Sequence, residues 1–215
     1  MHISVVIVHW NTPDILKKQL SKLKPSSQTE VIVVDNNSDT LPVVKSPYRF
    51  VRCSQNKGFA AGCNRGAAIA KGEWLLFLNP DTHLTTPELE SFVRSAERQR
   101  FDAASPLQTT ENYFKPLPTP LTLLIEFSPL RRWIRLPKQK QHTLFGGCLL
   151  LKRSVLNSLN GWDGDFFLWF EDSDLTKRLY LNNYRIGWVP LTYTHSGGSS
   201  FKHVDNRMKK RWFFS

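Results

Sequence analysis

Cysteines are scarce in this sequence and do not form a recognisable metal-binding pattern. The 215 residues include three cysteines, Cys53, Cys63 and Cys148, an odd number without the paired spacing of a zinc site. Disulfides are rare in reducing compartments. We therefore expect three reduced, buried thiols in a cytoplasmic protein.

Long apolar runs are absent as well. No stretch of consecutive apolar residues is long enough to span a bilayer. The N-terminus runs directly into a strand pattern with no basic region before it, so we predict no signal peptide. We expect the protein in the cytoplasm, with any membrane contact peripheral and at the inner face.

Acidic residues are outnumbered by basic ones, 18 to 29, which gives a net charge of +11. Such an excess favours polyanionic partners: nucleic acid, nucleoside diphosphates or an anionic membrane surface. The basic residues gather at Arg131–Lys140 and Arg207–Arg211, and neither cluster lies in a nucleic-acid-binding motif. We therefore expect no nucleic-acid partner. The second cluster, followed by three aromatic residues, could contact a membrane or pack on its own domain.

The length suits one α/β domain with a substantial core. Continuous apolar runs predict strands buried in a mostly parallel sheet, and capping signals predict flanking helices. The expected strands are Ile3–Val8, Glu30–Val34, Phe50–Cys53, Trp74–Leu78, Ala103–Pro106, Leu144–Leu151, Tyr184–Val189 and Leu191–Thr194. The expected helices include Pro13–Leu23, capped by Thr12, and Pro87–Gln99, Arg153–Leu159 and Phe167–Asn182.

The segment Glu73–Thr82 carries the first candidate ligand site. Its apolar run Trp74–Leu78 ends at Asn79-Pro80, because proline has no N–H for the next ladder bond. Asp81 then lies just past the carboxyl end of a central strand, where α/β sheets bind ligands. A carboxylate beside an amide suits a hard divalent cation shared with substrate phosphates. The same residue types also make ordinary turns.

A second polar cluster, Asp35–Thr40, follows the next predicted strand. Such a cluster is usually a turn, but it is also where a parallel sheet presents side chains to a ligand. Since Asp35 is expected to lie in a loop, its side chain should make few packing contacts.

Glycines recur every fourth residue within Asn56–Ala68. Gly58, Gly62 and Gly66 therefore share one helix face, which favours close packing of this helix on the sheet. The spacing matches neither a dinucleotide-binding fingerprint nor a P-loop. Lys57 could still reach a phosphate from the start of this helix.

Proline and glycine also punctuate the second half of the chain. The proline-rich stretch Gln108–Lys140 predicts a long irregular excursion over the sheet, and such segments are often functional. The next strand, Leu144–Leu151, has Gly146 and Gly147 early in it, where glycine permits a ligand or another backbone to approach closely.

Aromatic and acidic residues are interleaved in Trp162–Leu175. The predicted helix Phe167–Asn182 puts Glu171 and Asp172 near its N-terminal end, where the macrodipole favours carboxylates. These acids could be simple capping and surface residues. However, the aromatic neighbours would desolvate at least one of them and raise its basicity.

Together these segments resemble a family 2 glycosyltransferase with the GT-A fold, most similar to the rhamnosyltransferase-like branch. The resemblance covers nearly the whole chain, with the motifs in the family's order. The matching segments are Val5–Asn11 (VVIVHWN), Val34–Ser38 (VDNNS), Asn56–Gly66 (NKGFAAGCNRG), Leu78–Thr82 (LNPDT), Gly161–Leu175 (GWDGDFFLWFEDSDL) and His195–Ser200 (HSGGSS). The resemblance implies one inverting enzyme domain, with residues 1–106 binding the nucleotide-sugar, residues 107–200 holding the acceptor and catalytic groups, and residues 201–215 forming a basic-aromatic tail.

The resemblance also implies a donor site for a UDP- or dTDP-sugar. Asp35 would bind the pyrimidine base, in a pocket lined by the backbone around His9–Asn11. Asp81 would take the metal position of the family's D-x-D motif, and this chain has Asn79 where many members have the first Asp. His195, a lone histidine of the kind that is more often structural, would be a third group contacting Mn or Mg or the diphosphate. The further residues implied in the donor site are His9, Asn11, Asn37, Lys57 and Asn64.

On the acceptor side, the resemblance implies that Asp172 is the general base. Glu171 would hold the acceptor or the helix end, and Gly146, Gly147 and Trp169 would line the site. The acceptor would be a glycan or a lipid-linked glycan of bacterial surface polysaccharide synthesis.

Two alternatives stay open at this point. A nucleotidyltransferase-like enzyme needs a glycine- and basic-rich loop directly after the first strand, where this chain has His9–Pro13. A non-enzymatic nucleic-acid-binding protein is suggested by the charge alone, and it would bind oligonucleotides with a steep salt dependence.

Overall fold

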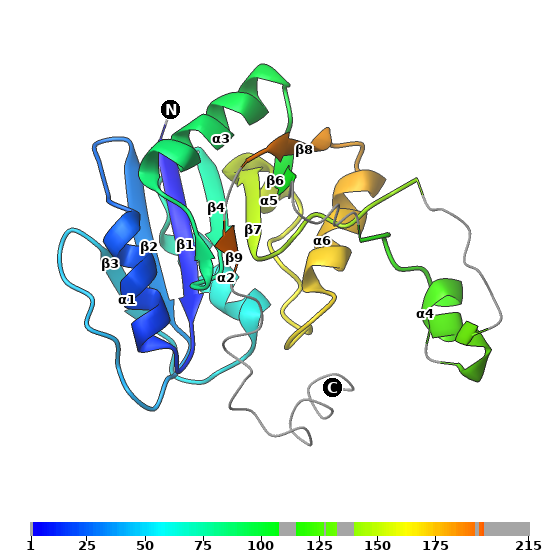
Figure 1. The fold of residues 1–215 in the computed structure, drawn as a ribbon, viewed down its shortest axis with the longest axis horizontal. Helices are drawn as coiled ribbons and strands as arrows, with labels where there is room; N and C mark the ends of the chain where they lie inside the picture. Colours follow the sequence, from blue (N-terminus) through cyan, green and yellow to red (C-terminus); the bar gives the residue numbers. More distant parts are fainter. Residues whose placement is uncertain (1, 108–114, 127, 133–139, 192–193, 196–215) are drawn as a thin grey trace.

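A seven-stranded sheet forms the centre of the molecule, in the strand order β3-β2-β1-β4-β7-β6-β8 (Figure 1). The structure, a computed structural model, describes residues 2–107, 115–126, 128–132, 140–191 and 194–195. Neighbouring strands are parallel except at β7, which runs antiparallel to both β4 and β6. The expected α/β domain with a mostly parallel sheet is confirmed.

The elements follow one another along the chain in the order that the sequence pattern predicts for most of its length. The strands are β1 (Ile3–His9), β2 (Thr29–Asp35), β3 (Arg49–Arg52), β4 (Trp74–Leu78), β5 (Thr82–His83), β6 (Ala103–Leu107), β7 (Cys148–Lys152), β8 (Ile186–Pro190) and β9 (Thr194–His195). The helices are α1 (Pro13–Lys22), α2 (Phe59–Ile69), α3 (Thr86–Arg98), α4 (Pro120–Glu126), α5 (Arg153–Ser158) and α6 (Glu171–Leu181), with a 3-10 helix, η1 (Pro129–Arg132).

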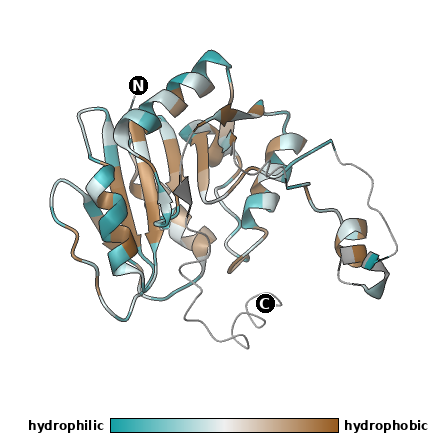
Figure 2. Ribbon diagram, viewed as in Figure 1, coloured by the Kyte–Doolittle hydropathy of each residue, from teal (hydrophilic) through white to brown (hydrophobic). Residues whose placement is uncertain are grey.

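Two apolar layers pack on the two faces of the sheet. Successive residues of β1 point to opposite faces, so Val5 joins the layer with α1 and α3, and Val6 joins the layer with α2, α5 and α6. β4 is apolar along its whole length, and β1 is apolar except at Ser4 and His9 (Figure 2). A strand covered by helices on both faces must be apolar on both, which is why the continuous apolar runs predicted these strands correctly.

The glycine face of α2 packs directly on the sheet, as expected. A Cβ at position 62 would lie 2.7 Å from Cγ1 of Val8, and one at Gly66 would collide with Val6 and touch Val34. Gly58, with φ of +92°, instead ends the turn before the helix.

The largest errors in the predicted boundaries are at the starts of β7 and α6, and β8 and β9 also begin later than predicted, at Ile186 and Thr194. Strand β7 begins at Cys148 instead of Leu144, so Gly146 and Gly147 lie in the turn before the strand and not early in it. The segment before β7 makes hydrogen bonds to other elements and therefore does not pair in the sheet. For example, the Leu144 N–H donates to Oγ1 of Thr176 in α6 at 3.0 Å.

Helix α6 begins at Glu171 instead of Phe167. Trp169 and Phe170 have φ of +66° and +64°, which a right-handed helix does not accommodate. The Phe167 carbonyl accepts a hydrogen bond from the N–H of Phe59 at the start of α2, at 3.0 Å. A contact between distant segments therefore holds this stretch out of the helix.

The stretch Gln108–Lys140 is not wholly irregular, because α4 and η1 form within it (Figure 1). None of the described helices is long and apolar enough to cross a membrane. The predicted tail, residues 201–215, lies outside the described residues, as does the side chain of His195.

Gly66→Ala should lower the free energy of unfolding by about 1–2 kcal/mol net, because the collision with Val6 outweighs alanine's better helix propensity. Urea denaturation followed by circular dichroism measures the change. Gly164→Ala is the matched control, since a Cβ there meets nothing within 4 Å. If the Gly66 variant is as stable as the wild type, the close packing is wrong.

Candidate active site

Three strands bring the donor-side residues to one edge of the sheet. His9 and Asp35 are register partners at the ends of β1 and β2, and the turn from Asn79 to Asp81 follows β4 on the other side of β1. The strand order changes direction between β1 and β4. Open α/β sheets bind ligands outside the carboxyl ends of strands at such a switch point.

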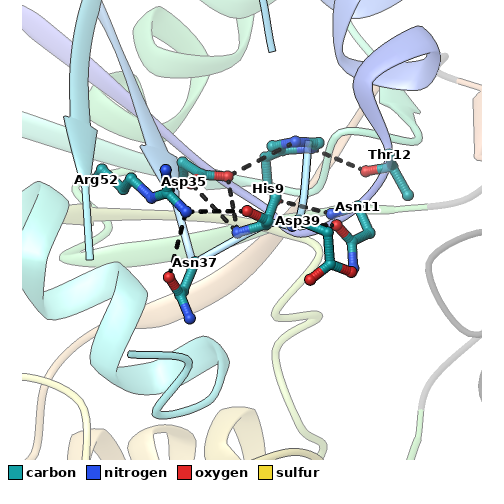
Figure 3. A network of polar contacts seen from close by, with 8 residues as sticks. His9, Asn11, Thr12, Asp35, Asn37, Asp39 and Arg52 are labelled. Carbon is teal, nitrogen blue, oxygen red and sulfur yellow. Dashed lines mark hydrogen bonds and ion pairs between the residues drawn. The ribbon is translucent and has the colours of Figure 1, made fainter. Parts of the chain in front are cut away.

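Asp35 is the centre of a buried polar network (Figure 3). Its Oδ2 lies 3.4 Å from Nε of Arg52, its Oδ1 lies 3.9 Å from Nε2 of His9, and the N–H of Ser38 donates to the carboxylate at 3.3 Å. The expectation of a loop carboxylate with little packing is wrong. Asp35 is the fully buried last residue of β2, and parallel pairing puts Arg52 of β3 beside it.

His9 is buried next to this carboxylate. Burial lowers the pKa of His9, and the nearby charge of Asp35 opposes the effect. Nδ1 of His9 lies 3.0 Å from Oγ1 of Thr12. The Thr12 hydroxyl therefore contacts the histidine and makes no capping hydrogen bond to α1, so the predicted side-chain cap is wrong. Pro13 is the first residue of the helix, as expected.

The loops after β1 and β2 are joined into one wall (Figure 3). Asn11 and Asn37 have left-handed φ of 51° and 62°. The side-chain amide of Asn11 donates to Asp39 at 3.0 Å and accepts from its N–H at 2.9 Å, while the Arg52 guanidinium lies 3.4 Å from Oδ1 of Asn37. His9, Asn11, Asp35 and Asn37 are thus brought together.

The structure separates Asn64 from that group. Its side chain donates to the carbonyl of Trp162 at 2.8 Å and accepts from the Trp162 N–H at 2.9 Å, so both ends of the amide are engaged. A donor contact would have to displace this bridge. Lys57 lies in the turn before α2, with an exposed side chain, and Asn36 holds that turn to the end of β2 by donating to the Gly58 carbonyl at 3.0 Å.

The turn after β4 meets the segment before β7. The N–H of Asn79 donates to the carbonyl of Gly147 at 2.9 Å, and Asp81 is 5% exposed. Strand β5 then pairs with β9, with Thr82 opposite His195, so the His195 backbone lies beside this turn. Among the described residues no group of three His, Cys, Asp or Glu side chains could hold a metal by itself.

Asp172 lies on the other side of the same two glycines. The N–H of Gly146 approaches its Oδ2 at 3.4 Å, and a Cβ at Gly146 would be 2.9 Å from its Cβ. A side chain on Gly147 would in turn meet the Asn79 amide, at 2.9 Å. The two glycines therefore connect the β4 turn with the start of α6, as close backbone approach requires.

Glu171 is desolvated, as its aromatic neighbours in the sequence predicted for at least one of the two acids. Its Oε2 is buried without a hydrogen-bond partner in the described part of the chain. Burial, together with the charge of Asp172, raises the pKa of Glu171 to about 7, although the Lys115 charge opposes the rise. The Glu171 charge in turn helps to raise the pKa of buried Cys63. Adjacent residues on a helix point about 100° apart, so Glu171 turns toward α2 while Asp172 faces Gly146.

Sequence reasoning missed Arg52 and Lys115. Arg52 ends β3 directly opposite Asp35, a pairing that only the register of the sheet reveals. Nζ of Lys115 lies 5.5 Å from the ring centroid of Phe170, beside Trp169, whose side chain is 37% exposed. No local pattern in the proline-rich segment pointed to Lys115.

Comparison with known proteins identifies the family. The profile of glycosyl transferase family 2 matches residues 4–159, and the one described as the N-terminal domain of galactosyltransferase matches residues 135–204. Because the first match covers most of the chain, the protein belongs to glycosyl transferase family 2. Membership favours glycosyl transfer over the two alternatives that the sequence left open.

Curated relatives include two rhamnosyltransferases. Rhamnosyltransferase WbbL of Escherichia coli (strain K12) is 25% identical over 226 residues, which cover 92% of this chain and 85% of WbbL. The N-acetylglucosaminyl-diphospho-decaprenol L-rhamnosyltransferase of Mycobacterium tuberculosis is 25% identical over 224 residues, covering 87% of this chain and 72% of the relative.

Solved structures share the fold, which is of the GT-A type. The mannosyltransferase PcManGT from Pyrobaculum calidifontis, in complex with GDP-Man and Mn²⁺, gives a TM-score of 0.64 at 16% identity, over 88% of this chain and 55% of that one. S. aureus TarS 1-349 in complex with UDP-GlcNAc gives a TM-score of 0.63 at 16% identity, over 94% of this chain and 61% of that one. The chain thus spans just over half of the PcManGT chain and of the TarS 1-349 chain, and 36% of the longer TarS chain.

The stability of the protein should depend on the protonation of Glu171. Its folded-state pKa of about 7 exceeds the ordinary value of 4.5. The contribution of the protonated carboxyl to the free energy of unfolding is therefore fully present below pH 4.5 and is lost as the pH rises through 7. Across that range the wild type should lose up to roughly 3 kcal/mol relative to Glu171→Gln. Urea unfolding of both proteins measures the difference, and a difference independent of pH would contradict the buried position of Oε2.

Proposed function

We propose that this protein is an inverting glycosyltransferase that moves a sugar from a nucleoside-diphosphate-sugar to a hydroxyl group of a glycan or lipid-linked acceptor. The observation that carries the proposal is the pair of glycines between two carboxylate sites: Gly147 contacts Asn79 beside Asp81, and Gly146 contacts Asp172. A donor diphosphate near Asp81 and a base at Asp172 would then flank one reacting carbon. Rhamnose is the leading candidate sugar, because two relatives are named as rhamnosyltransferases.

The buried network around Asp35 is suited to binding the base of the donor. A carboxylate held by Arg52 and the Ser38 amide has oxygen lone pairs left to accept from a base N–H, and burial makes such a bond selective. The joined Asn11 and Asn37 loops would line the pocket, with Lys57 near the diphosphate. We expect a pyrimidine nucleotide, UDP or dTDP.

The residues after β4 fit a divalent cation, Mn²⁺ or Mg²⁺, held jointly with a diphosphate. Asp81 would supply one buried carboxylate and Asn79 an amide oxygen, and the family resemblance adds His195, whose backbone pairs with Thr82. Such cations often take their other ligands from substrate phosphates and water. When bound, the cation would neutralise the charge on the departing diphosphate.

Asp172 would act as the general base in a single displacement. Its carboxylate accepts the proton of the acceptor hydroxyl while the hydroxyl oxygen bonds to the anomeric carbon and the bond from that carbon to the diphosphate breaks. A positioned base of this kind accelerates a reaction by about 10²–10⁴. Glu171, partly buried beside it, would hold the start of α6 and the acceptor pocket near Trp169.

A screen of UDP- and dTDP-sugars for hydrolysis in the presence of Mn²⁺ tests the proposal. We expect one sugar nucleotide to be turned over in preference to the rest. Failure of every pyrimidine sugar nucleotide, with hydrolysis of a purine one, would overturn the assignment of the base pocket.

Turnover should require the divalent cation and should be lost with EDTA or with Asp81→Ala. The physical reason is that a diphosphate leaves slowly when its charge is not neutralised. Asp14→Ala, an exposed acid on α1, is the matched control and should keep normal turnover. Full activity in EDTA would refute the metal's role.

Asp172→Asn should reduce kcat by roughly 10² or more, because the amide cannot accept the hydroxyl proton. Donor affinity measured by calorimetry should stay near that of the wild type, and Glu171→Gln should cost less. Asp165→Asn, an exposed acid in the same segment, serves as the control. If Glu171→Gln is inactive and Asp172→Asn is not, the two roles are exchanged.

A further inference from the structure

An arm stands away from the body of the molecule (Figure 1). We define the arm by its described residues, 115–126, 128–132 and 140–143, which include α4 and η1. Its two legs are joined at the base, where Leu117 N–H donates to the Gln141 carbonyl at 2.9 Å and Thr143 N–H donates to the Lys115 carbonyl at 2.8 Å. The arm therefore has a defined stem and projects α4 outward.

Helix α4 carries an apolar face that the protein does not cover. Leu121 and Leu124 are 63% and 70% exposed, and their spacing of three residues puts them on the same side of the helix. Apolar colour on the projecting helix is visible in Figure 2. The N-terminus of α4 is held locally, since Thr119 Oγ1 accepts from the Thr122 N–H at 3.2 Å. The helix thus forms without burying its leucines against the sheet.

The arm that carries this apolar face is rich in basic residues. The described residues of the arm include four basic ones, Lys115, Arg131, Arg132 and Lys140, and one acidic one, Glu126. Arg132, at the end of η1, and Lys140, at the start of the returning leg, are exposed. An exposed apolar helix face and exposed cations on one arm form a combination that can bind the interface of an anionic membrane.

We propose that the arm docks on an anionic lipid surface, with Leu121 and Leu124 entering the interface and Arg132 and Lys140 contacting the phosphate headgroups. A second copy of the chain is a poorer occupant, because two arms of the same sign of charge would repel. A stable protein interface also needs at least about 1,000 Å² of buried surface, far more than two leucines offer, whereas a membrane accepts shallow insertion of a short helix face.

The position of the arm gives the docking a consequence. Its returning leg continues into the segment that contacts α6, where Oγ1 of Thr143 lies 3.2 Å from Oγ of Ser173 and Gly146 contacts Asp172. Docking would tether to the membrane the segment that contacts the candidate base. This consequence, unlike the docking itself, rests on the proposed function, because it matters only for a lipid-linked acceptor.

Co-sedimentation of the full chain with vesicles tests the docking. We expect binding to vesicles of equal parts phosphatidylglycerol and phosphatidylcholine, little binding to phosphatidylcholine alone, and weaker binding at high salt. The double variant Leu121→Gln, Leu124→Gln should lower the partition coefficient about tenfold. The double variant Arg132→Gln, Lys140→Gln should lower it as well and reduce its salt dependence.

Matched controls separate the arm from the rest of the surface. Leu181→Gln replaces a leucine that is 69% exposed on α6, and Lys17→Gln with Lys18→Gln removes two exposed charges on α1. The α6 control should bind as the wild type does, and the α1 control should bind more strongly than the arm's charge variant. Gel filtration of each variant checks that the oligomeric state is unchanged.

The docking is wrong if the wild type ignores anionic vesicles, or if the leucine variant binds as well as Leu181→Gln. It is also wrong if deletion of residues 207–215 alone abolishes binding while the arm variants bind normally, or if the leucine variant changes only the oligomeric state. If the wild type binds anionic vesicles but transfers sugar from no nucleoside-diphosphate-sugar, the proposed function is wrong and the docking still holds.

Discussion

Strand β1 pairs in parallel with a strand on each side, and the register of β1, β2 and β3 determines where His9, Asp35 and Arg52 lie. His9 is opposite Asp35 because β1 and β2 end together, and Arg52 is opposite Asp35 because β3 follows the same register. A slip of one residue would turn Asp35 to the other face of the sheet. The apolar layers on both faces prevent such a slip, since it would also expose the core side chains of β1 and β2.

The second constraint is the absence of side chains at Gly146 and Gly147. The turn before β7 passes between the end of β4 and the start of α6, touching Asn79 on one side and Asp172 on the other. Any side chain there would push apart the two regions that the proposed reaction requires to be close. The end of β4 and the start of α6 are thus coupled through the backbone of this turn.

Asp35, which is fully buried, and Glu171, which is partly buried, lie in opposite environments. Asp35 keeps an arginine, a histidine and a backbone N–H around it, which offsets the cost of burial. Glu171 has a buried oxygen without a partner among the described residues, and its pKa rises instead. The first arrangement suits recognition of a ligand, and the second makes the charge of the site depend on pH.

The sequence by itself determined the local features of the fold. The apolar runs predicted β1, β2 and β4, Asn79-Pro80 ended β4, and the glycine spacing predicted the contact face of α2. Each follows from side chains that are neighbours in the chain or lie one helical turn apart. The motifs, read in order, also identified the family.

Only the tertiary structure decided which distant residues meet. Phe167 stays out of α6 because its carbonyl is bonded to Phe59, more than a hundred residues earlier in the chain. In the same way, Asp35 is buried because of Arg52, and Glu171, not its neighbour, faces α2. Periodicity and residue type describe what a segment can do locally. They carry no information on the partner across the fold, and burial and pKa depend on that partner.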